Sequence, residues 1–405
     1  TTRPAARETR RAEGGTARPG RAESPAASPA ATLAPADTAP AGASPAADTP
    51  TPGEVQPAAT PAPTLPPASA TASPQAVPTA PPLAVGGPKQ ARGVIAVTQH
   101  DVAFLPATFT NASVDGIMIR TFWSSVEPTE GHYDWSFLDG QVSTAASHGK
   151  KAVVVVLPGA FTPSWAAQGV QMATFSSKYG FTAGQPLTLP LPWDQTYLKR
   201  WFTFVQTLGQ RYDSNPAVML VPAAGPTSIS AEMSLPDGSD AVAQWRQLGY
   251  TPQKFIDAWA QTVAAYVQAF PTTQIALTLY PGLPIPDASA SDETRTTIPS
   301  AAEGKYGSKI TIQTSGLSAR KEDKPRIGYQ TVQQYSQRTT VGFEMGTSAT
   351  ERPDRMGGQD ATSALRGSID FGLQAGAKYL EIYEKDVDNP GLQSIISYAH
   401  TALDR

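Results

Sequence analysis

The sequence predicts an α/β protein whose main part is a (β/α)8 barrel, or TIM barrel. Short apolar runs rich in β-branched residues alternate with amphipathic helical stretches from about residue 91 to residue 405. Several of the runs are apolar at nearly every position, as parallel strands covered on both faces are. Eight such strands with helices between them are typical of a closed barrel.

Eight segments have the composition of these strands. No glycine-rich phosphate-binding loop follows any of them, which disfavours an open doubly wound sheet, the main rival fold. From first to eighth, they are 93–98, 116–123, 151–158, 217–223, 274–280, 309–314, 340–345 and 378–383.

The clearest helical stretch begins after Asp194, a residue type that caps helix N-termini well. Similar stretches cover 252–270 and 361–377, and the second of these ends in a glycine-containing turn before the last strand. In the first stretch, the apolar residues recur at spacings of three and four: Tyr197, Leu198, Trp201, Val205, Leu208 and Tyr212.

The first ninety residues have a different composition. No aromatic residue occurs before Phe104, and residues 1–88 are mostly Ala, Pro, Thr, Ser and Gly. Such a segment cannot bury enough apolar surface to offset the entropy of ordering it, so we expect a disordered low-complexity tail or linker. We therefore divide the chain into a tail, 1–90, and a barrel domain, 91–405.

Composition excludes several classes of function. The net charge is −3 and no basic stripe occurs, so we expect no nucleic-acid partner. No long apolar run predicts a membrane span. Cysteine is absent and the four histidines are not at ligand spacing, so we expect neither a metal nor another cofactor. A Pro/Ala/Thr spacer before a cysteine-free domain is typical of secreted or surface-tethered bacterial proteins, and we expect such a location and a monomer.

Glutamates stand at the C-terminal ends of three predicted strands, where barrel enzymes place their sites. Side chains alternate along a strand, so Glu344 in the seventh strand faces the barrel interior, as do Glu381 and Tyr383 in the eighth. Glu232 follows the fourth strand, in the loop above the barrel. Arg120 faces inward near the end of the second strand.

Two carboxyl groups are the minimum equipment for hydrolysing a glycosidic bond. One is protonated and donates to the leaving oxygen, while the other is ionised and attacks the anomeric carbon or activates water. A neighbouring arginine favours the ionised form. Each glutamate also has a structural alternative, because an inward carboxylate can pair with a basic residue and a loop carboxylate can simply be solvated.

The stretch from Ile119 to Val156, "IRTFWSSVEPTEGHYDWSFLDGQVSTAASHGKKAVVVV", resembles the second-strand region of clan A glycoside hydrolases, the β-galactosidase and cellulase superfamily. The resemblance continues in "LPGAFTPSWAAQG" after the third strand and in "WDQTYLKRWFTFVQTLGQRYDSNPAV" before the fourth. The first motif is formed by Arg120, Trp123, Glu127, Pro128, Gly131, Tyr133, Asp134, Trp135, Asp139, Gly149 and Lys150.

The resemblance implies roles for three residues. Glu232 becomes the acid/base, Glu344 becomes the nucleophile, and Arg120 holds the nucleophile and lowers its pKa. The sequence departs from the clan at the fourth strand, where Asn-Glu is usual and "AAGPTSISAE" stands instead. Either this loop folds back to deliver Glu232, or the chain is a divergent or inactive relative.

Aromatic rings suit the apolar face of a sugar. We expect Trp123 and Trp165, in loops at the C-terminal ends of strands, to bind substrate together with Arg120 and Tyr383. We expect Glu381 to bind a sugar hydroxyl or the arginine, and it is the reserve candidate for a catalytic carboxylate.

The expected function is a retaining glycoside hydrolase that acts on an oligo- or polysaccharide without a cofactor. The alternative is a barrel that binds carbohydrate without cleaving it, for example as a component of the cell surface. The missing Asn-Glu favours the alternative, whereas Arg120 and Glu344 favour the enzyme.

Overall fold

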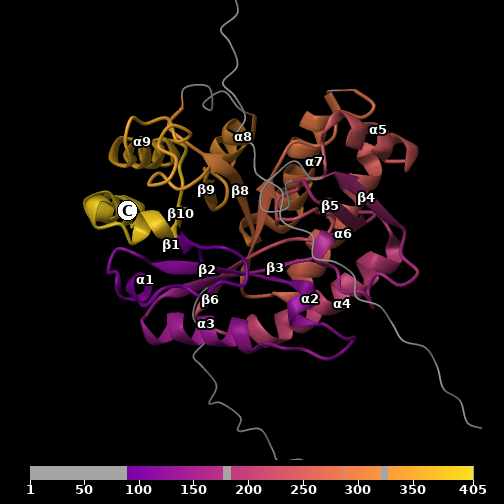
Figure 1. Ribbon diagram of the computed structural model, residues 1–405, viewed down its shortest axis with the longest axis horizontal. Helices are drawn as coiled ribbons and strands as arrows, with labels where there is room; N and C mark the ends of the chain where they lie inside the picture. Colours follow the sequence, from indigo (N-terminus) through magenta and orange to yellow (C-terminus); the bar gives the residue numbers. More distant parts are fainter. Residues whose placement is uncertain (1–88, 177–183, 288, 321–326, 405) are drawn as a thin grey trace, which may run out of the picture. The chain divides into compact units, whose positions relative to one another are not determined.

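The computed structural model describes residues 89–176, 184–287, 289–320 and 327–404 (Figure 1). The expected disordered tail, 1–90, falls almost entirely outside the described residues. All eight predicted barrel strands are in the described part.

Eight parallel strands form a closed barrel, and all eight sequence predictions are confirmed. Neighbouring strands follow chain order, and β10 pairs with β1 to close the ring, with Glu381 opposite Ile95. Because the strands are parallel, their C-terminal ends lie at one end of the barrel. The strands are β1 Gly93–Val97, β2 Gly116–Phe122, β3 Lys151–Leu157, β6 Val218–Pro222, β7 Gln274–Leu279, β8 Ile310–Leu317, β9 Val341–Met345 and β10 Tyr379–Tyr383.

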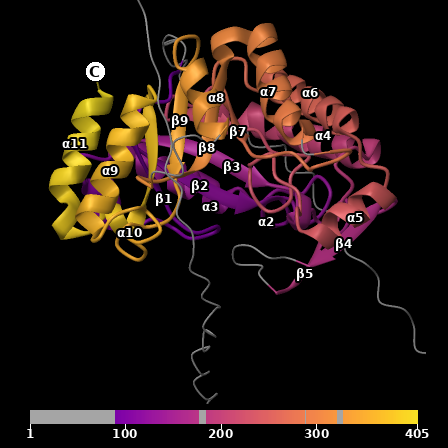
Figure 2. The ribbon, with the colours of Figure 1, turned by 90° about the horizontal axis from the view of Figure 1, so that it is seen from above.

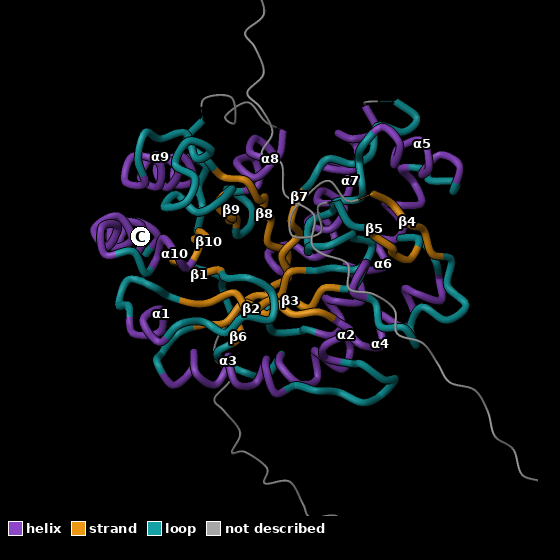
Figure 3. Tube along the Cα trace, in the orientation of Figure 1, coloured by secondary structure: helices purple, strands orange, loops and turns teal. Residues whose placement is uncertain are grey.

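Helices lie outside the strands (Figure 3). The predicted cap is present, since the Asp194 carboxylate accepts hydrogen bonds from the backbone N–H groups of Thr196 and Tyr197. None of the helices in the described ranges is both long and apolar enough to cross a membrane. The helices are α1 Pro106–Thr110, α2 Trp123–Val126, α3 Ser136–Ser147, α4 Gln195–Tyr212, α5 Ser239–Gln247, α6 Pro252–Ala269, α7 Ser289–Tyr306, α8 Ile327–Tyr335, α9 Ala361–Gln374, α10 Glu384–Val387 and α11 Gln393–Leu403.

The core has two layers, because alternate side chains of each strand face opposite ways. Leu380 and Ile382 belong to the large outer cluster between strands and helices. Tyr379 belongs to the smaller inner cluster. That inner cluster also contains Ile95, Val97, Met118, Val153, Val155, Leu157 and Met219.

A two-stranded antiparallel hairpin between β3 and α4 was not predicted. It consists of β4, Met172–Ser176, and β5, Pro186–Pro190. The hairpin lies beside α5 (Figure 2). The ring of Phe175 stacks on Trp245 with 4.5 Å between centroids, and the Gln244 side-chain amide donates to the backbone oxygen of Thr174 at 3.1 Å.

Gly342 in β9 allows a large side chain to fill the barrel interior. It faces inward, where a Cβ atom would overlap the ring of Tyr379. Tyr379 is fully buried, and its hydroxyl donates to Gln313 in β8 at 2.6 Å. The absence of a side chain at position 342 therefore makes room for a ring that reaches across from β10.

We predict that Gly342→Ala destabilises the domain by about 1–3 kcal/mol, the usual cost of overpacking a filled core. Urea unfolding measures the change. Gly140→Ala is the matched control, because position 140 is exposed in α3 and a Cβ there meets no atom within 4 Å. A Gly342→Ala variant as stable as the Gly140→Ala variant would contradict this interpretation.

Candidate active site

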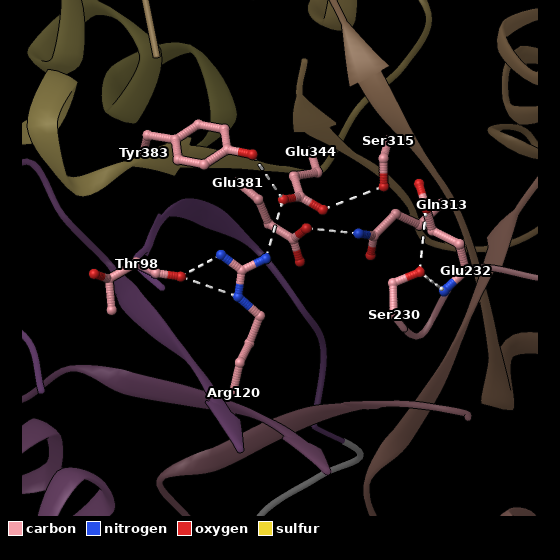
Figure 4. A network of polar contacts seen from close by, with 9 residues as sticks. All are labelled: Thr98, Arg120, Ser230, Glu232, Gln313, Ser315, Glu344, Glu381 and Tyr383. Carbon is pink, nitrogen blue, oxygen red and sulfur yellow. Dashed lines mark hydrogen bonds and ion pairs between the residues drawn. The ribbon is translucent and has the colours of Figure 1, made fainter. Parts of the chain in front are cut away.

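A cavity of about 520 Å³ opens at the C-terminal ends of the barrel strands. We call it the inner cavity. Residues from several strands, loops and helices line it, among them Arg120 of β2, Gln313 of β8, Glu344 of β9, Tyr383 of β10 and Glu232 after β6 (Figure 4). The barrel therefore brings together both predicted glutamates and the predicted arginine.

Glu344 accepts contacts from three donors. Its Oε1 lies 3.3 Å from Nη1 of Arg120 and 3.4 Å from the hydroxyl of Tyr383, and its Oε2 accepts from Ser315 at 3.2 Å. The side chains of Arg120 and Glu344 are only 14% and 15% exposed. This carboxylate is held in one orientation and still borders the cavity.

Arg120 is itself held by the backbone. Its Nε donates to the carbonyl oxygen of Thr98 at 3.1 Å, and its Nη2 donates to the same oxygen. Thr98 follows β1 directly, so the guanidinium is fixed between β1 and β9. One nitrogen remains directed at Glu344 (Figure 4).

The loop after β6 folds back and returns Glu232 to the barrel mouth. Tyr197 and Trp201 of α4 hold the start of the loop by donating to the carbonyl oxygens of Gly225, at 2.5 Å, and Ala224, at 2.6 Å. At its far end, Glu232 forms a parallel bridge with Thr278 of β7. A glutamate that comes late in the sequence is thereby placed at a strand end.

The environment of Glu232 differs from that of Glu344. The hydroxyl of Ser230 donates to its Oε2 at 3.2 Å. Burial, and secondly the negative charge of Glu344, raise the pKa of Glu232 to about 7. A carboxyl group with a pKa raised in this way can hold a proton and donate it as an acid.

Glu381 faces inward as predicted, but it lies beneath the inner cavity. It is fully buried and is not among the described residues that line the cavity. Its Oε2 accepts from the side-chain amide of Gln313 at 2.6 Å. Burial, and then the charge of Glu344, raise the pKa of Glu381 well above its usual value. The expectation that Glu381 binds a sugar is therefore wrong, because enclosed packing separates it from the cavity.

The expectation that Trp123 binds substrate is also wrong. Trp123 is fully buried outside the barrel, in an aromatic cluster with Trp201, and its indole N–H donates to Glu127 at 2.9 Å. Phe122, its neighbour, instead stacks on His100, which lines the cavity. At the end of β2 the chain turns into α2, so Trp123 points away from the barrel.

Trp165 packs in the same region as Trp123. The two rings meet edge to face at 5.7 Å, and the indole N–H of Trp165 donates to the backbone oxygen of Glu127 at 3.0 Å. Trp165 is not among the described residues that line the inner cavity. Its ring is partly exposed, unlike that of Trp123, and its contact with substrate stays a prediction.

Several cavity residues were not selected from the sequence. One of them is His100, which follows β1; burial and then the charge of Arg120 lower its pKa to about 4, so its ring is neutral at pH 7. Gln313 and Ser315 of β8 also line the cavity. The sixth predicted strand, 309–314, also contains Lys309, Thr311 and Thr314, so no local signal singled out Gln313. Among the described residues, no three His, Asp or Glu side chains are grouped to hold a metal ion.

We predict that Glu344→Gln lowers the pKa of Glu232 below the parent value of about 7, because the substitution removes a nearby negative charge. Carbon-detected NMR titration of side-chain carboxyl groups measures both values, with Glu232→Gln assigning the resonance. Burial alone would account for the raised pKa if the Glu232 titration were the same in the parent and the Glu344→Gln variant.

Similarity to known proteins agrees with this geometry. Residues 102–261 match the family model described as Beta-galactosidase (Glyco_hydro_42). No protein with a curated description is a match.

Solved structures of glycosidases resemble the chain weakly. An intracellular xylanase from Thermoanaerobacterium saccharolyticum is 13% identical, with a TM-score of 0.46 over 72% of this chain and 85% of that one. An exo-β-1,4-mannosidase from an Opitutaceae bacterium is 11% identical, with a TM-score of 0.44 over 78% and 60% of the two chains. A β-galactosidase from the psychrophilic Marinomonas ef1 is 12% identical, with a TM-score of 0.43 over 72% and 53%. At these sequence identities and TM-scores, the activities of the three enzymes are not assigned to this chain.

The family match begins in the loop after β1 and ends within α6. The remaining strands complete the same closed barrel and supply the second cavity glutamate, Glu344. Residues 102–261 therefore resemble a glycoside hydrolase family, and the domain that contains them is a (β/α)8 barrel.

Proposed function

We propose that the protein hydrolyses O-glycosidic bonds of an oligo- or polysaccharide with retention of anomeric configuration. Glu344 is the nucleophile and Glu232 is the acid/base. The observation that supports this assignment most strongly is the contrast between two carboxyl groups that share the inner cavity. Glu344 faces a guanidinium and two hydroxyl donors, whereas burial raises the pKa of Glu232 to about 7.

The first step forms a covalent intermediate. Glu232 gives its proton to the glycosidic oxygen as the bond from that oxygen to the anomeric carbon breaks, and a Glu344 oxygen bonds to the anomeric carbon. In the second step Glu232, now ionised, takes a proton from water. The water oxygen attacks the anomeric carbon, the ester bond breaks, and Glu344 is again a carboxylate. No cofactor takes part in either step.

Arg120 and Tyr383 position the nucleophile in this mechanism. The guanidinium and the phenol both contact Oε1 of Glu344, whereas Oε2 accepts from Ser315. The charge of Glu344, followed by burial, raises the pKa of Tyr383, so the phenol stays protonated and donates. Tyr383 also lines the cavity, where its ring is available to the apolar face of a sugar.

The N-terminal composition supports a location outside the cell, where polysaccharide substrates occur. We propose that the protein is secreted or attached to the cell surface, because residues 1–88 have the composition of a solvated spacer.

We predict that Glu232→Gln lowers kcat about 10²–10⁴-fold on glycosides with poor leaving groups, the usual contribution of a general acid. A dinitrophenyl leaving group needs no proton, so the first step on such glycosides is largely spared in Glu232→Gln. Glu344→Gln removes activity on both kinds of substrate. Initial rates on a panel of aryl glycosides measure these effects.

Glu303→Gln is the matched control for these two variants, because Glu303 lies in α7 and pairs with Arg338, outside the described residues that line the inner cavity. If Glu232→Gln leaves slow substrates unaffected, Glu232 is not the acid/base. If the parent cleaves no glycoside but binds oligosaccharides, the barrel has a binding function instead.

A further inference from the structure

A second cavity of about 700 Å³ adjoins the first. We call it the outer cavity. The two cavities share four lining residues: His100, Ser230, Glu232 and Tyr280. Among the described residues, Glu344 lines only the inner cavity. Glu232 therefore stands at the junction, with the proposed nucleophile on one side and the outer cavity on the other.

The wall of the outer cavity is a fixed part of the fold. It is formed by the β4–β5 hairpin and by α5 with the segment before it. Phe175 of the hairpin stacks on Trp245 of α5, and Gln244 of α5 donates to the backbone of Thr174. The indole N–H of Trp245 also donates to the backbone oxygen of Pro236 at 3.0 Å. Two of these contacts join the hairpin to α5, and the third holds α5 to the segment before it.

The lining chemistry suits an uncharged sugar. Ser228 and Ser234 bring hydroxyl groups, and the ring of Tyr280 stands where the two cavities meet. Asp237 and Asp240 bring two carboxyl groups in addition to Glu232. Hydroxyl and carboxyl oxygens bind sugar hydroxyls, whereas the carboxylates repel an anionic sugar. The cavity volume is within the range of small-molecule sites.

The position of the acid indicates which part of a substrate the outer cavity takes. In the proposed mechanism, Glu232 lies beside the glycosidic oxygen and Glu344 lies against the anomeric carbon. The sugar that becomes attached to Glu344 must occupy the inner cavity. The group on the other side of the glycosidic oxygen lies beyond Glu232, which is where the outer cavity begins.

We propose that the outer cavity is the leaving-group subsite and that it takes a neutral sugar, so that the substrate is a neutral oligo- or polysaccharide. This inference rests on the proposed function. It adds that the leaving group is itself a saccharide and that the β4–β5 hairpin and α5 determine specificity for it.

A bulky residue in the wall tests the proposal. Ala241 of α5 lines the outer cavity and is half-buried, so a tryptophan there occupies the space of the leaving sugar. We expect Ala241→Trp to lower kcat/KM for neutral tri- and tetrasaccharides at least about tenfold relative to kcat/KM for a phenyl glycoside of the same sugar, as lost pocket contacts usually do. Ala243→Trp is the matched control, because Ala243 is exposed on the same helix and does not line the cavity.

Asp237→Ala is a second variant that leaves the helix unchanged, and thermal unfolding verifies that each variant is folded. We expect Asp237→Ala to lower the same ratio and to improve relative cleavage of a uronic-acid oligosaccharide. If both folded variants keep the parent ratio, the outer cavity is not the leaving-group subsite, although the proposed function stands. The same conclusion follows if the parent cleaves phenyl glycosides but no oligosaccharide.

If the parent cleaves nothing, the proposed function fails, and calorimetry with the same oligosaccharides decides whether the outer cavity binds sugar. Weaker binding by Ala241→Trp than by Ala243→Trp would retain the cavity as a saccharide site. Equal binding by the two variants would overturn the inference.

Discussion

The ion pair between Arg120 and Glu344 depends on the closure of the barrel. The two residues are 224 positions apart in the chain, and β1 and β10 lie between their strands. Only when β10 pairs with β1 do the guanidinium and the carboxylate come within 3.3 Å of each other. The period of two along each strand then decides which side chains reach the interior.

Closure of the barrel also places the carboxyl groups of Glu344 and Glu381 close together in different environments. Glu344 and Glu381 are opposite each other in neighbouring strands, yet one borders a cavity and the other is enclosed. The guanidinium contacts Glu344, while Glu381 receives an amide hydrogen bond from Gln313. The site therefore offers one carboxylate held by a cation and directed at the cavity, with Glu232 as its partner across it.

The fold was predictable because several of its strands are nearly continuous apolar runs, as parallel strands covered on both faces are. The inward orientation of Glu344 and Glu381 followed from alternation alone. The family resemblance identified Glu232 as a candidate. Its position beside β7, however, depends on a loop that is held by hydrogen bonds from Tyr197 and Trp201, and no local sequence pattern predicts these contacts.

The remaining differences have physical causes. Trp123 stands where β2 becomes α2, so strand alternation no longer applies to it, and the ring joins the outer core. The burial of Glu381 depends on packing inside the barrel. The side-chain amide of Gln313, which is 68 positions away in the chain, donates to Glu381, and the hydroxyl of Tyr379 donates to Gln313. The β4–β5 hairpin is short and covers a cavity rather than extending the sheet, so its strands lack the apolar signal of the barrel strands.

The most direct test of this account is to trap the intermediate. A 2-deoxy-2-fluoro glycoside with a dinitrophenyl leaving group slows both steps, and the second more visibly, so that the ester accumulates. Peptide mass spectrometry after incubation with a panel of such sugars locates the adduct. The account predicts one glycosyl group, on Glu344. An adduct on Glu232 or Glu381, or turnover of natural substrate with inverted configuration, would contradict it.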